Sequence, residues 1–482
     1  MGSILTKRTR VEMITTKSTK APLDLLRLGD DLLLQILILL SAKDIVAVRE
    51  TCKYLSCVSS SRYLWHHLLR RDVVKQYAPI PSYRKPNLEL SSQQLELLTR
   101  RALRLDSSPQ EPTIVRFDQT RSITWIRLVH GQWMLVASSS PKESTLSLYS
   151  STSFQDGKPE LLASTQLPGP VSSGEVEVQE DQLVVALCFQ SPERMVTVLS
   201  VRQCENSLSF LELSRFAGLS HIRCLRKDLI GCGVQGEINA PCVANWRTGE
   251  VVTFSAPEVD GRCLAMTLRD GICAVVIGET LYIHSLLADG RTELAQTIYL
   301  SHVVGNVVIS GESESSPVSD AATAPERFQL FITNKTGIYV YSVRQQDSTT
   351  FSADLIVEEE TKPGASQSAR PSYPLFGGST SRVSWIYAPT SFFDRQPHLV
   401  TAKIQRKDGE AKTCAAELSV VSECKDSKLP ALYTLPVMHY DDGAGLMAIG
   451  NACGQLALCS FGGSMPSGLA GCFRDVPVPR MV

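Results

Sequence analysis

Residues 23–69 read LDLLRLGDDLLLQILILLSAKDIVAVRETCKYLSCVSSSRYLWHHLL, and this stretch decides the fold of the amino-terminal part of the chain. The range 32–40 is apolar on every side except at Gln35, which is typical of a helix buried in a core or shared between two proteins. It is too short to cross a bilayer, since spanning needs about 20 apolar residues and Asp30 and Asp31 stop it short. So short a segment cannot bury this much apolar surface alone, which predicts a protein partner.

Two more helices are expected in the same stretch. Ser41 and Asp44 have the spacing of a helix N-terminal cap, in which a hydroxyl accepts a free backbone amide hydrogen. The serines at 56–61 are expected to interrupt the helix that starts there, and Ser61 is expected to cap the next one. Spacings of three and four group the apolar residues of each helix: Ile45, Val48, Cys52 and Leu55, then Leu64, Trp65, Leu68 and Leu69.

Together these residues resemble the F-box motif. That motif opens with a Leu-Pro pair and an apolar helix, continues through Pro/Ser-x-x-Asp-Leu and Val-Cys-Lys steps, and closes on Leu-Trp. Gly29 stands where the family usually has proline, which loosens the start of the helix without removing a contact. The residues at matching places are Leu28, Ile36, Leu37, Leu40, Ser41, Asp44, Ile45, Val48, Thr51, Cys52, Lys53, Leu55, Leu64 and Trp65.

The resemblance implies docking to the Skp-family adaptor of a cullin-RING ubiquitin ligase, through aliphatic side chains that act as anchors. The alternative is an ordinary helical hairpin packed on the rest of the chain, although amphipathicity alone does not demand the order Asp-Ile, Cys-Lys and Leu-Trp. The residues expected to contact the adaptor are Leu28, Ile36, Leu37, Ile45, Val48, Cys52, Leu64 and Trp65.

The composition of the chain bounds its class. At 482 residues it is too long for one hydrophobic core, which predicts two or more domains. Its 48 Lys and Arg residues balance 49 Asp and Glu residues, so no long-range field gathers nucleic acid or an anionic membrane. No early apolar run resembles a secretory signal, and the 14 scattered cysteines resemble buried free thiols. We expect an intracellular protein, in the cytoplasm, the nucleus or both, with no membrane span.

Four segments are expected along the chain. They are a disordered tail at 1–22, the F-box-like helical module at 23–72, a linker with a helix at 73–111 and a β domain at 112–482. The tail carries a basic cluster at 7–10. The cluster is assigned to a solvated tail, and a nuclear address or part of a transit peptide is the alternative.

The linker helix is predicted by a second capping box at 91–94 and is expected to end near Asp106. Its apolar stripe is expected to pack on one of the flanking domains, so that packing sets the separation between them. The stripe consists of Leu95, Leu98, Ala102 and Leu105, and the side expected to be exposed carries Glu96, Arg100, Arg101 and Arg104.

From about residue 112 the pattern changes to short β-branched and aromatic runs divided by turn residues. Paired runs recur roughly every 40–65 residues, near the blade period of a β-propeller, and we count about seven. The unit at 244–252 resembles a degenerate WD-repeat blade, although the defining Gly-His and Trp-Asp pairs do not repeat, and a pair of β-sandwiches is the alternative. The paired runs lie at 133–149, 183–200, 229–254, 272–284, 329–341, 398–420 and 446–458.

Three further segments of the β domain are assigned a role. The early strand at 113–117 is expected to complete the last blade, so that no sheet edge stays open. The segments at 311–326 and 358–384 are expected to be mobile insertions, since both are rich in small residues and proline. The expected fold is therefore a multi-domain chain with a small helical module, a linker helix and an all-β, propeller-like domain of about seven blades.

Few signals point to chemistry. The pattern Gly-x-Gly-x-x-Gly at 231–236 spells a dinucleotide site, but no helix is expected to begin there, so the glycines are assigned to a bulge or a crowded strand. The histidines and cysteines lack metal-ligand spacing, and Asp441 and Asp442 are assigned to a turn before Gly443. We therefore predict no cofactor, no metal and no catalytic residue.

The sequence predicts a non-catalytic substrate-recognition adaptor of a Skp-cullin-F-box ubiquitin ligase, which holds the Skp-family adaptor by its helices and a target protein by its propeller. One alternative is an F-box-containing scaffold or trafficking protein that acts outside a ligase. The other is a propeller enzyme, which needs acids, histidines or metal ligands to converge at the central channel.

Overall fold

The computed structural model describes most of residues 28–462. The predicted tail at 1–22 lies outside the described residues, and so does nearly all of the predicted insertion at 311–326. The ranges between 28 and 462 that are not described are 77, 82–86, 88, 108–111, 152, 157–158, 180–181, 191–193, 205–206, 235–239, 255–261, 270, 288–291, 303, 311–325, 335–336, 348–349, 361–369, 377–381, 389–397, 407–413 and 421–427.

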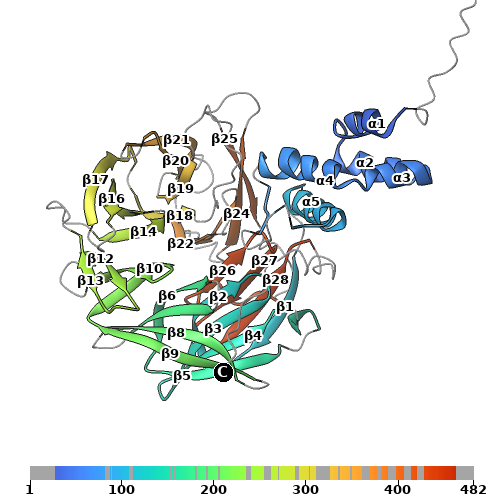
Figure 1. Cartoon of the computed structure of the whole chain (residues 1–482). Helices are drawn as coiled ribbons and strands as arrows, with labels where there is room; N and C mark the ends of the chain where they lie inside the picture. Colours follow the sequence, from blue (N-terminus) through green and yellow to red (C-terminus); the bar gives the residue numbers. More distant parts are fainter. Residues whose placement is uncertain are drawn as a thin grey trace, which may run out of the picture.

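A small helical module lies beside a ring of β-sheets, with its helices at one side of the ring (Figure 1). The linker helix predicted from the sequence is confirmed as the longest helix of this part. The helical elements are α1 (Asp30–Leu37), α2 (Ala42–Arg49), α3 (Lys53–Ser59), α4 (Arg62–Leu68), the π-helix η2 (Leu69–Val74) and α5 (Ser92–Ser107), and a 3₁₀ turn, η3 (Ser153–Asp156), lies among the strands.

Side-chain caps mark the starts of α2 and α5, whereas Ser61 precedes α4 without the side-chain capping hydrogen bond that was expected of it. The Ser41 hydroxyl accepts a hydrogen bond from the Asp44 backbone N–H at 3.2 Å, as the spacing predicts. The Ser91 hydroxyl accepts one from the Gln94 N–H at 3.2 Å, and the Gln94 amide oxygen accepts one from the Ser91 N–H at 2.9 Å. This reciprocal pair is a capping box, which explains why α5 begins at Ser92.

The break predicted at the serines is confirmed, since α3 ends at Ser59 and α4 begins at Arg62, but a second break was not predicted. It lies at residues 50–52, where Cys52 caps α3 and its sulfur accepts the Leu55 N–H at 3.5 Å. Two of the serines at the predicted break donate to the Ser56 carbonyl, Ser59 at 3.1 Å and Ser60 at 2.8 Å. Their hydroxyls bond back to the last turn of α3, which is where this helix ends.

Seven four-stranded antiparallel sheets make up the described β domain. Each is called a blade and is numbered in chain order. Blade 1 consists of β2 (Ser122–Val129), β3 (Trp133–Ser139), β4 (Ser144–Ser150) and β5 (Leu161–Leu167), and blade 2 of β6 (Val171–Val178), β7 (Leu183–Phe189), β8 (Met195–Cys204) and β9 (Ser207–Ala217). Blade 3 consists of β10 (Leu219–Arg226), β11 (Leu229–Val234), β12 (Ala240–Asn245) and β13 (Val251–Thr253), and blade 4 of β14 (Cys263–Arg269), β15 (Ile272–Ile277), β16 (Thr280–Leu286) and β17 (Thr292–Tyr299).

Blades 5 to 7 repeat the same order, and the last one includes a strand from the start of the domain. Blade 5 consists of β18 (Asn306–Ser310), β19 (Glu326–Thr333), β20 (Gly337–Gln345) and β21 (Phe351–Glu360), and blade 6 of β22 (Arg370–Phe376), β23 (Arg382–Ala388), β24 (His398–Arg406) and β25 (Cys414–Val420). Blade 7 consists of β26 (Val437–Asp441), β27 (Leu446–Gly450) and β28 (Gln455–Ser460), together with β1 (Thr113–Asp118).

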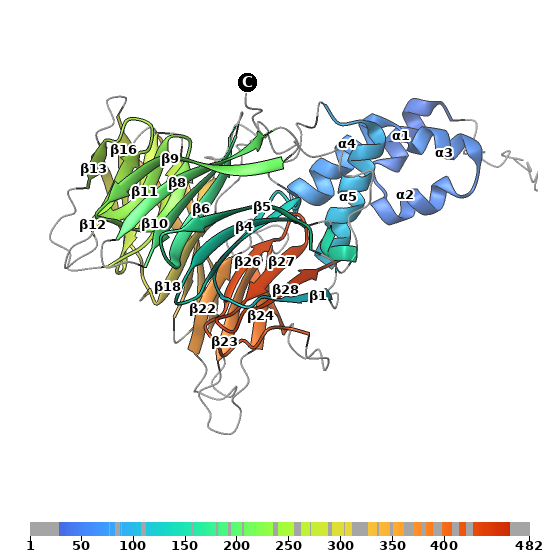
Figure 2. The same cartoon turned by 90° about the horizontal axis from the view of Figure 1, so that it is seen from below.

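The blades form a closed ring, seen face-on in Figure 1 and from below in Figure 2. The first strand of each blade contacts the first strand of the next, in the cycle β2, β6, β10, β14, β18, β22, β26 and back to β2. Strand β1 pairs with β28 from Thr113 opposite Ser460 to Asp118 opposite Gln455. The expected propeller of about seven blades, completed by the early strand, is confirmed.

The propeller core lies between the blades, because both faces of each inner strand are covered. In β7, Leu183 and Val185 pack toward blade 1, whereas Val184 and Ala186 pack toward blade 3. Alternation along a strand sends successive side chains to opposite faces, so a strand buried on both faces reads as a continuous apolar run. This explains why the strongest runs in the sequence mark the second and third strands of the blades.

The prediction of a mobile insertion at 358–384 is wrong for much of that range. Strand β21 continues to Glu360, the range 370–376 forms β22, and β23 starts at Arg382. Pro371 and Pro374 lie in β22, and its register shifts between Ser372 and Pro374. Prolines at a bulged strand give no β-branched alternation, so the pattern resembles a loop.

His439 on β26 joins the last blade to the first. Its Nδ1 accepts a hydrogen bond from the Leu128 backbone N–H on β2 at 3.1 Å. Burial, together with the positive charge of Arg127, holds the pKa of His439 well below its ordinary value of 6.5. The unfolded chain therefore takes up a proton there at a higher pH than the folded chain does. The contribution of neutral His439 to the free energy of unfolding is therefore fully present above about pH 6.5, and it is lost as the pH falls toward the pKa of the folded chain.

We expect the free energy of unfolding to fall more steeply with acid in the native chain than in a His439→Gln variant. Between pH 6.5 and 5.5 the native chain should lose about 1 kcal/mol more of its free energy of unfolding than the variant does. One proton taken up on unfolding changes this free energy by about 1.4 kcal/mol per pH unit. Urea unfolding at both pH values measures it. Equal slopes in the two proteins would show that His439 does not couple ring closure to pH.

Candidate partner-binding surface

Four of the residues predicted to contact a partner form the interior of the helical module. Ile45, Leu64 and Trp65 are 0% exposed and Leu37 is 3% exposed. In the folded chain these four side chains are covered by its own residues. They pack in one core cluster with Leu33 and with residues of α5, and so they hold the helices together.

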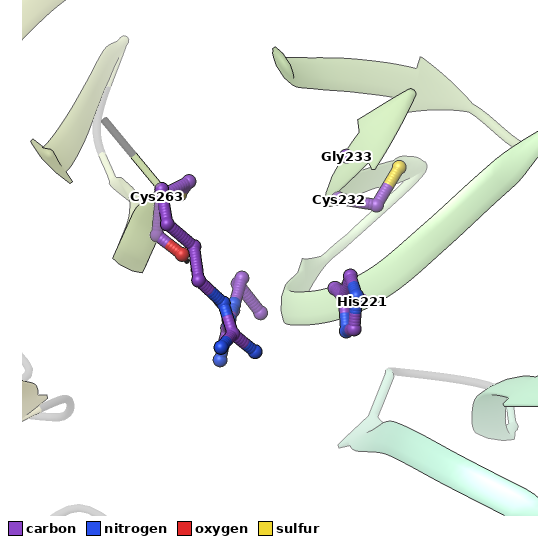
Figure 3. Close-up of a pocket in the computed structure, with 6 residues that line it drawn as sticks. His221, Cys232, Gly233 and Cys263 are labelled. Carbon is purple, nitrogen blue, oxygen red and sulfur yellow. Dashed lines mark hydrogen bonds between the residues drawn. The ribbon is translucent and has the colours of Figure 1, made fainter. Parts of the chain in front are cut away.

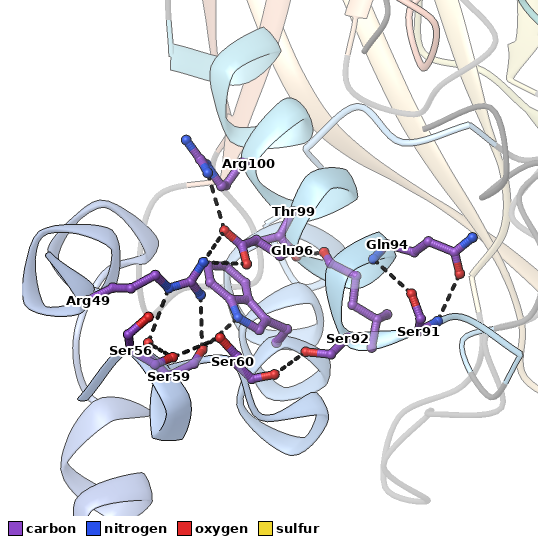
Figure 4. A network of polar contacts seen from close by, with 12 residues as sticks. Arg49, Ser56, Ser59, Ser60, Ser91, Ser92, Gln94, Glu96, Thr99 and Arg100 are labelled. Atoms are coloured by element: carbon purple, nitrogen blue, oxygen red, sulfur yellow. Dashed lines mark hydrogen bonds and ion pairs between the residues drawn. The ribbon is translucent and has the colours of Figure 1, made fainter. Parts of the chain in front are cut away.

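Trp65 is fixed by polar contacts as well as by packing. Its indole Nε1 donates to the Ser59 carbonyl at 2.9 Å, and the Arg49 guanidinium lies 5.6 Å from its ring centroid. Arg49 also donates to both carboxylate oxygens of Glu96 on α5, at 2.9 and 2.8 Å (Figure 4). A buried indole and a bidentate ion pair thus connect α2 and α4 to the linker helix.

Helix α5 covers much of the apolar surface that the sequence assigned to a partner. Leu95, Leu98 and Ala102 of α5 belong to the same core cluster as Trp65. The charged side of α5 was predicted to be exposed, but Glu96 pairs with Arg49, and Arg101 is buried. The helical module and the linker helix therefore form one packed unit.

One apolar face of the module stays open to solvent, and it lies on α1 and the turn after it. Leu32 is 58% exposed, Ile36 39% and Leu39 79%. Leu32 and Ile36 are one turn apart on α1, beside the face that buries Leu33 and Leu37, and Leu39 follows in the turn after the helix. We call Leu32, Ile36 and Leu39 the α1 outer face.

Of the predicted contact residues, Ile36 belongs to the α1 outer face, while Leu28, Val48 and Cys52 are partly buried against the module core. Leu32 and Leu39 were not predicted, and neither were two exposed aromatic residues, Tyr54 and Tyr63. On α1 the position along the helical turn separates exposed from buried residues, because the helix buries only positions 33 and 37.

Polar contacts fix both ends of α1. The Tyr54 hydroxyl donates to the Asp30 carboxylate at 2.6 Å, and this hydrogen bond, with some burial and the Asp30 charge, raises the pKa of Tyr54. At the other end, the Arg71 guanidinium donates to the carbonyls of Ile38 and Leu40 and pairs with Asp72. Arg71 thereby satisfies carbonyls at the C-terminal end of the helix, which orients the turn that carries Leu39.

Helix α5 also contacts blade 7, at the turn between β26 and β27. Arg101 donates to the Ala444 carbonyl at 2.5 Å. A Cβ on Gly445 would lie 2.7 Å from Leu105 Cδ2, and one on Gly443 would lie 2.6 Å from the backbone of Pro81. The turn is therefore built of glycine where the linker approaches it closely, and this contact sets the position of the α1 outer face relative to the propeller.

Comparisons with known proteins match the helical module to a family. Residues 25–71 match the F-box-like family model, so the chain carries an F-box-like domain. Among solved structures, the β-propeller domain of Cps50 (Swd1) from Myceliophteria thermophila is similar to this chain at 11% identity and a TM-score of 0.47, covering 72% of this chain and 100% of that one. The comparison with curated proteins gave no match. An F-box-like domain followed by a propeller is typically a pairing of non-catalytic adaptor domains.

The described residues include neither a candidate membrane-spanning helix nor a candidate metal site. No described helix has both the length and the apolar character needed to cross a membrane. No group of three or more His, Cys, Asp and Glu side chains in the described ranges is placed to hold a metal ion.

Proposed function

We propose that this protein is the substrate-recognition subunit of a Skp-cullin-F-box type ubiquitin ligase inside the cell. The F-box-like domain binds a Skp-family adaptor, and the propeller holds the protein that is to be ubiquitinated. Such a subunit needs no catalytic group, because holding a target beside a charged conjugating enzyme raises its effective concentration.

The α1 outer face is the observation that carries this proposal. Leu32, Ile36 and Leu39 project from a module whose other large aliphatic residues are mostly covered by its own helices. Exposed aliphatic side chains in a row at helical spacing favour a helix-in-groove contact with a second protein. The match of residues 25–71 to the F-box-like model supports a Skp-family adaptor as that protein.

Replacing Leu32 and Ile36 with glutamate is expected to weaken adaptor binding about 1,000-fold, if each anchor contributes about 2 kcal/mol. Glutamate keeps the helix propensity, so the module should stay folded. The measurement is the Kd of the purified full chain for a Skp-family protein. The matched control places glutamate at Leu161 and Tyr299, which are exposed apolar residues of the propeller. A double variant that binds like this control would rule out the α1 outer face.

The ligase role is tested by assembling the full chain with the Skp-family adaptor, a cullin and its RING partner. Proteins captured by the propeller should gain ubiquitin in this assembly and should accumulate in cells when the proteasome is inhibited. A scaffold or trafficking protein that acts outside a ligase would bind the adaptor but leave the amount of its captured protein unchanged by the inhibitor.

A further inference from the structure

A pocket of about 330 Å³ lies where the ring closes, between the connection 119–121 and strands β3, β4 and β5 of blade 1. Sites for small molecules have volumes of about 300–1,000 Å³. The pocket between blades 3 and 4, where Cys263 lies across from Cys232 and His221 (Figure 3), has only about 10 Å³, room for one water molecule. We call the larger one the ring-closure pocket.

Strand β4 supplies one side of the ring-closure pocket. Thr145, Ser147 and Tyr149 alternate along this strand, so their side chains lie on one face of the sheet. The neighbouring strands extend the same face, because Ser138 of β3 lies opposite Thr145 and Ser164 of β5 lies opposite Ser147. The described lining on this face is therefore rich in hydroxyl groups.

Several polar groups of the lining keep free hydrogen-bonding capacity. The Gln119 side-chain N–H donates to the Tyr149 hydroxyl at 3.1 Å, but the Gln119 amide oxygen has no partner among the described residues. Thr120 is exposed, and its hydroxyl has no partner in the described part of the chain either. The Ser147 and Ser164 oxygens are 3.5 Å apart, at the limit of a hydrogen bond. These groups suit a ligand whose own groups both donate and accept, as hydroxyls do.

The ring-closure pocket carries no unbalanced charge. Arg121 is the charged residue of its described lining, and its guanidinium pairs with Glu143 and donates to the Thr145 hydroxyl at 2.9 Å. An ion that entered the pocket would lose water without meeting a free countercharge, which costs free energy. The charge balance therefore favours an uncharged ligand.

One large apolar side chain lies beside these hydroxyls. Leu161 of β5 is opposite Tyr149 in the sheet and lines the pocket, yet it is 54% exposed. A ligand with C–H surface would cover it and remove apolar area from water. A sugar ring combines hydroxyls at its edge with C–H groups on its faces, and so it matches both parts of the lining.

We propose that the ring-closure pocket binds an uncharged sugar unit. The sugar hydroxyls bond to the Gln119 amide oxygen and to the hydroxyls of Thr120 and Ser164, while a C–H face of the ring covers Leu161. The sugar unit is either a free saccharide or one that is attached to a protein. This proposal does not rest on the ligase role of the chain.

The test is titration of the full chain with glucose, N-acetylglucosamine and maltose, by calorimetry and by saturation-transfer NMR. We expect saturable binding of at least one of them, weakened about tenfold in the double variant Thr120→Val, Ser164→Ala, which removes two neutral hydrogen bonds. Both residues are exposed, so the variant should stay folded. The control is Thr165→Val, next to Ser164 on β5 with its side chain on the other face of the strand, and its affinity should equal that of the native chain.

Three results would overturn the proposal: no saturable binding of any of the three sugars, equal affinity in the native chain and the double variant, or tighter binding of glucose 6-phosphate than of glucose. The methyl glycoside of the sugar that binds distinguishes the two sources, because a sugar attached to a protein has its anomeric oxygen substituted. Equal or tighter binding of the glycoside supports a sugar carried by a protein, whereas weaker binding supports a free saccharide.

Discussion

Replacing Trp65 with alanine is expected to unfold the helical module while the propeller stays folded. Trp65 is fully buried, and its indole N–H bonds to the Ser59 carbonyl. Removing a buried tryptophan side chain typically costs about 3–5 kcal/mol, and here it also leaves the Ser59 carbonyl without that donor. Hydrogen exchange followed by mass spectrometry should show α1 to α5 losing protection, whereas the strands of the seven blades keep theirs.

Tyr63→Ala is the matched control for this prediction. Tyr63 lies on the same helix, α4, but its side chain is 56% exposed. Its removal should leave the exchange of the module close to that of the native chain. If Trp65→Ala exchanges like Tyr63→Ala, the core assigned to the module is wrong. Loss of adaptor binding in Trp65→Ala would reflect unfolding, so this variant cannot locate the binding surface.

Gly454→Ala is expected to be the most damaging glycine substitution in the propeller. Gly454 has φ of 81°, and a Cβ there would lie 2.3 Å from the Gln119 carbonyl oxygen and 2.7 Å from that of Arg121. These backbone atoms belong to the connection between β1 and β2, where the ring closes. The Gly454 carbonyl also accepts the Gln119 N–H at 2.7 Å. We expect a loss of stability on the order of 4 kcal/mol, since backbone atoms cannot move aside locally.

The control is Gly249→Ala, which has nearly the same backbone conformation without the contact. Gly249 has φ of 80°, and nothing lies within 4 Å of the position of its Cβ. Only the left-handed conformation is penalised there, at about 1 kcal/mol. Urea unfolding of both variants separates conformational strain from the steric clash. Similar losses in the two proteins would contradict a tight closure of the ring at Gly454.

Local patterns predicted the fold of this chain well. Apolar runs such as the one in β7 marked strands because both faces of each are buried between blades. The serine hydroxyls of Ser41 and Ser91 marked helix starts because they accept hydrogen bonds from free backbone N–H groups. Strand β22 was missed because prolines hide its pattern. The break before α3 was missed because a cysteine, which is not a common capping residue, occupies the cap position.

The binding surface was harder to predict, because apolar character alone does not separate a core from an interface. Trp65 and Ile36 both match the family motif, yet one is fully buried and the other is exposed. Their difference depends on where α5 packs, and that contact involves Arg49 and Glu96, which are 47 residues apart. A small pocket between blades 3 and 4 is lined by residues of both blades, beside a bulge at 221–223 that no sequence spacing indicates.

Hydrogen exchange of the full chain, alone and with a purified Skp-family adaptor, tests the central proposal most directly. The adaptor is expected to slow exchange across residues 30–40, which carry the α1 outer face, and to leave α5 and the seven blades unchanged. Unchanged exchange at 30–40 in the presence of bound adaptor, with protection on the propeller instead, would contradict the account.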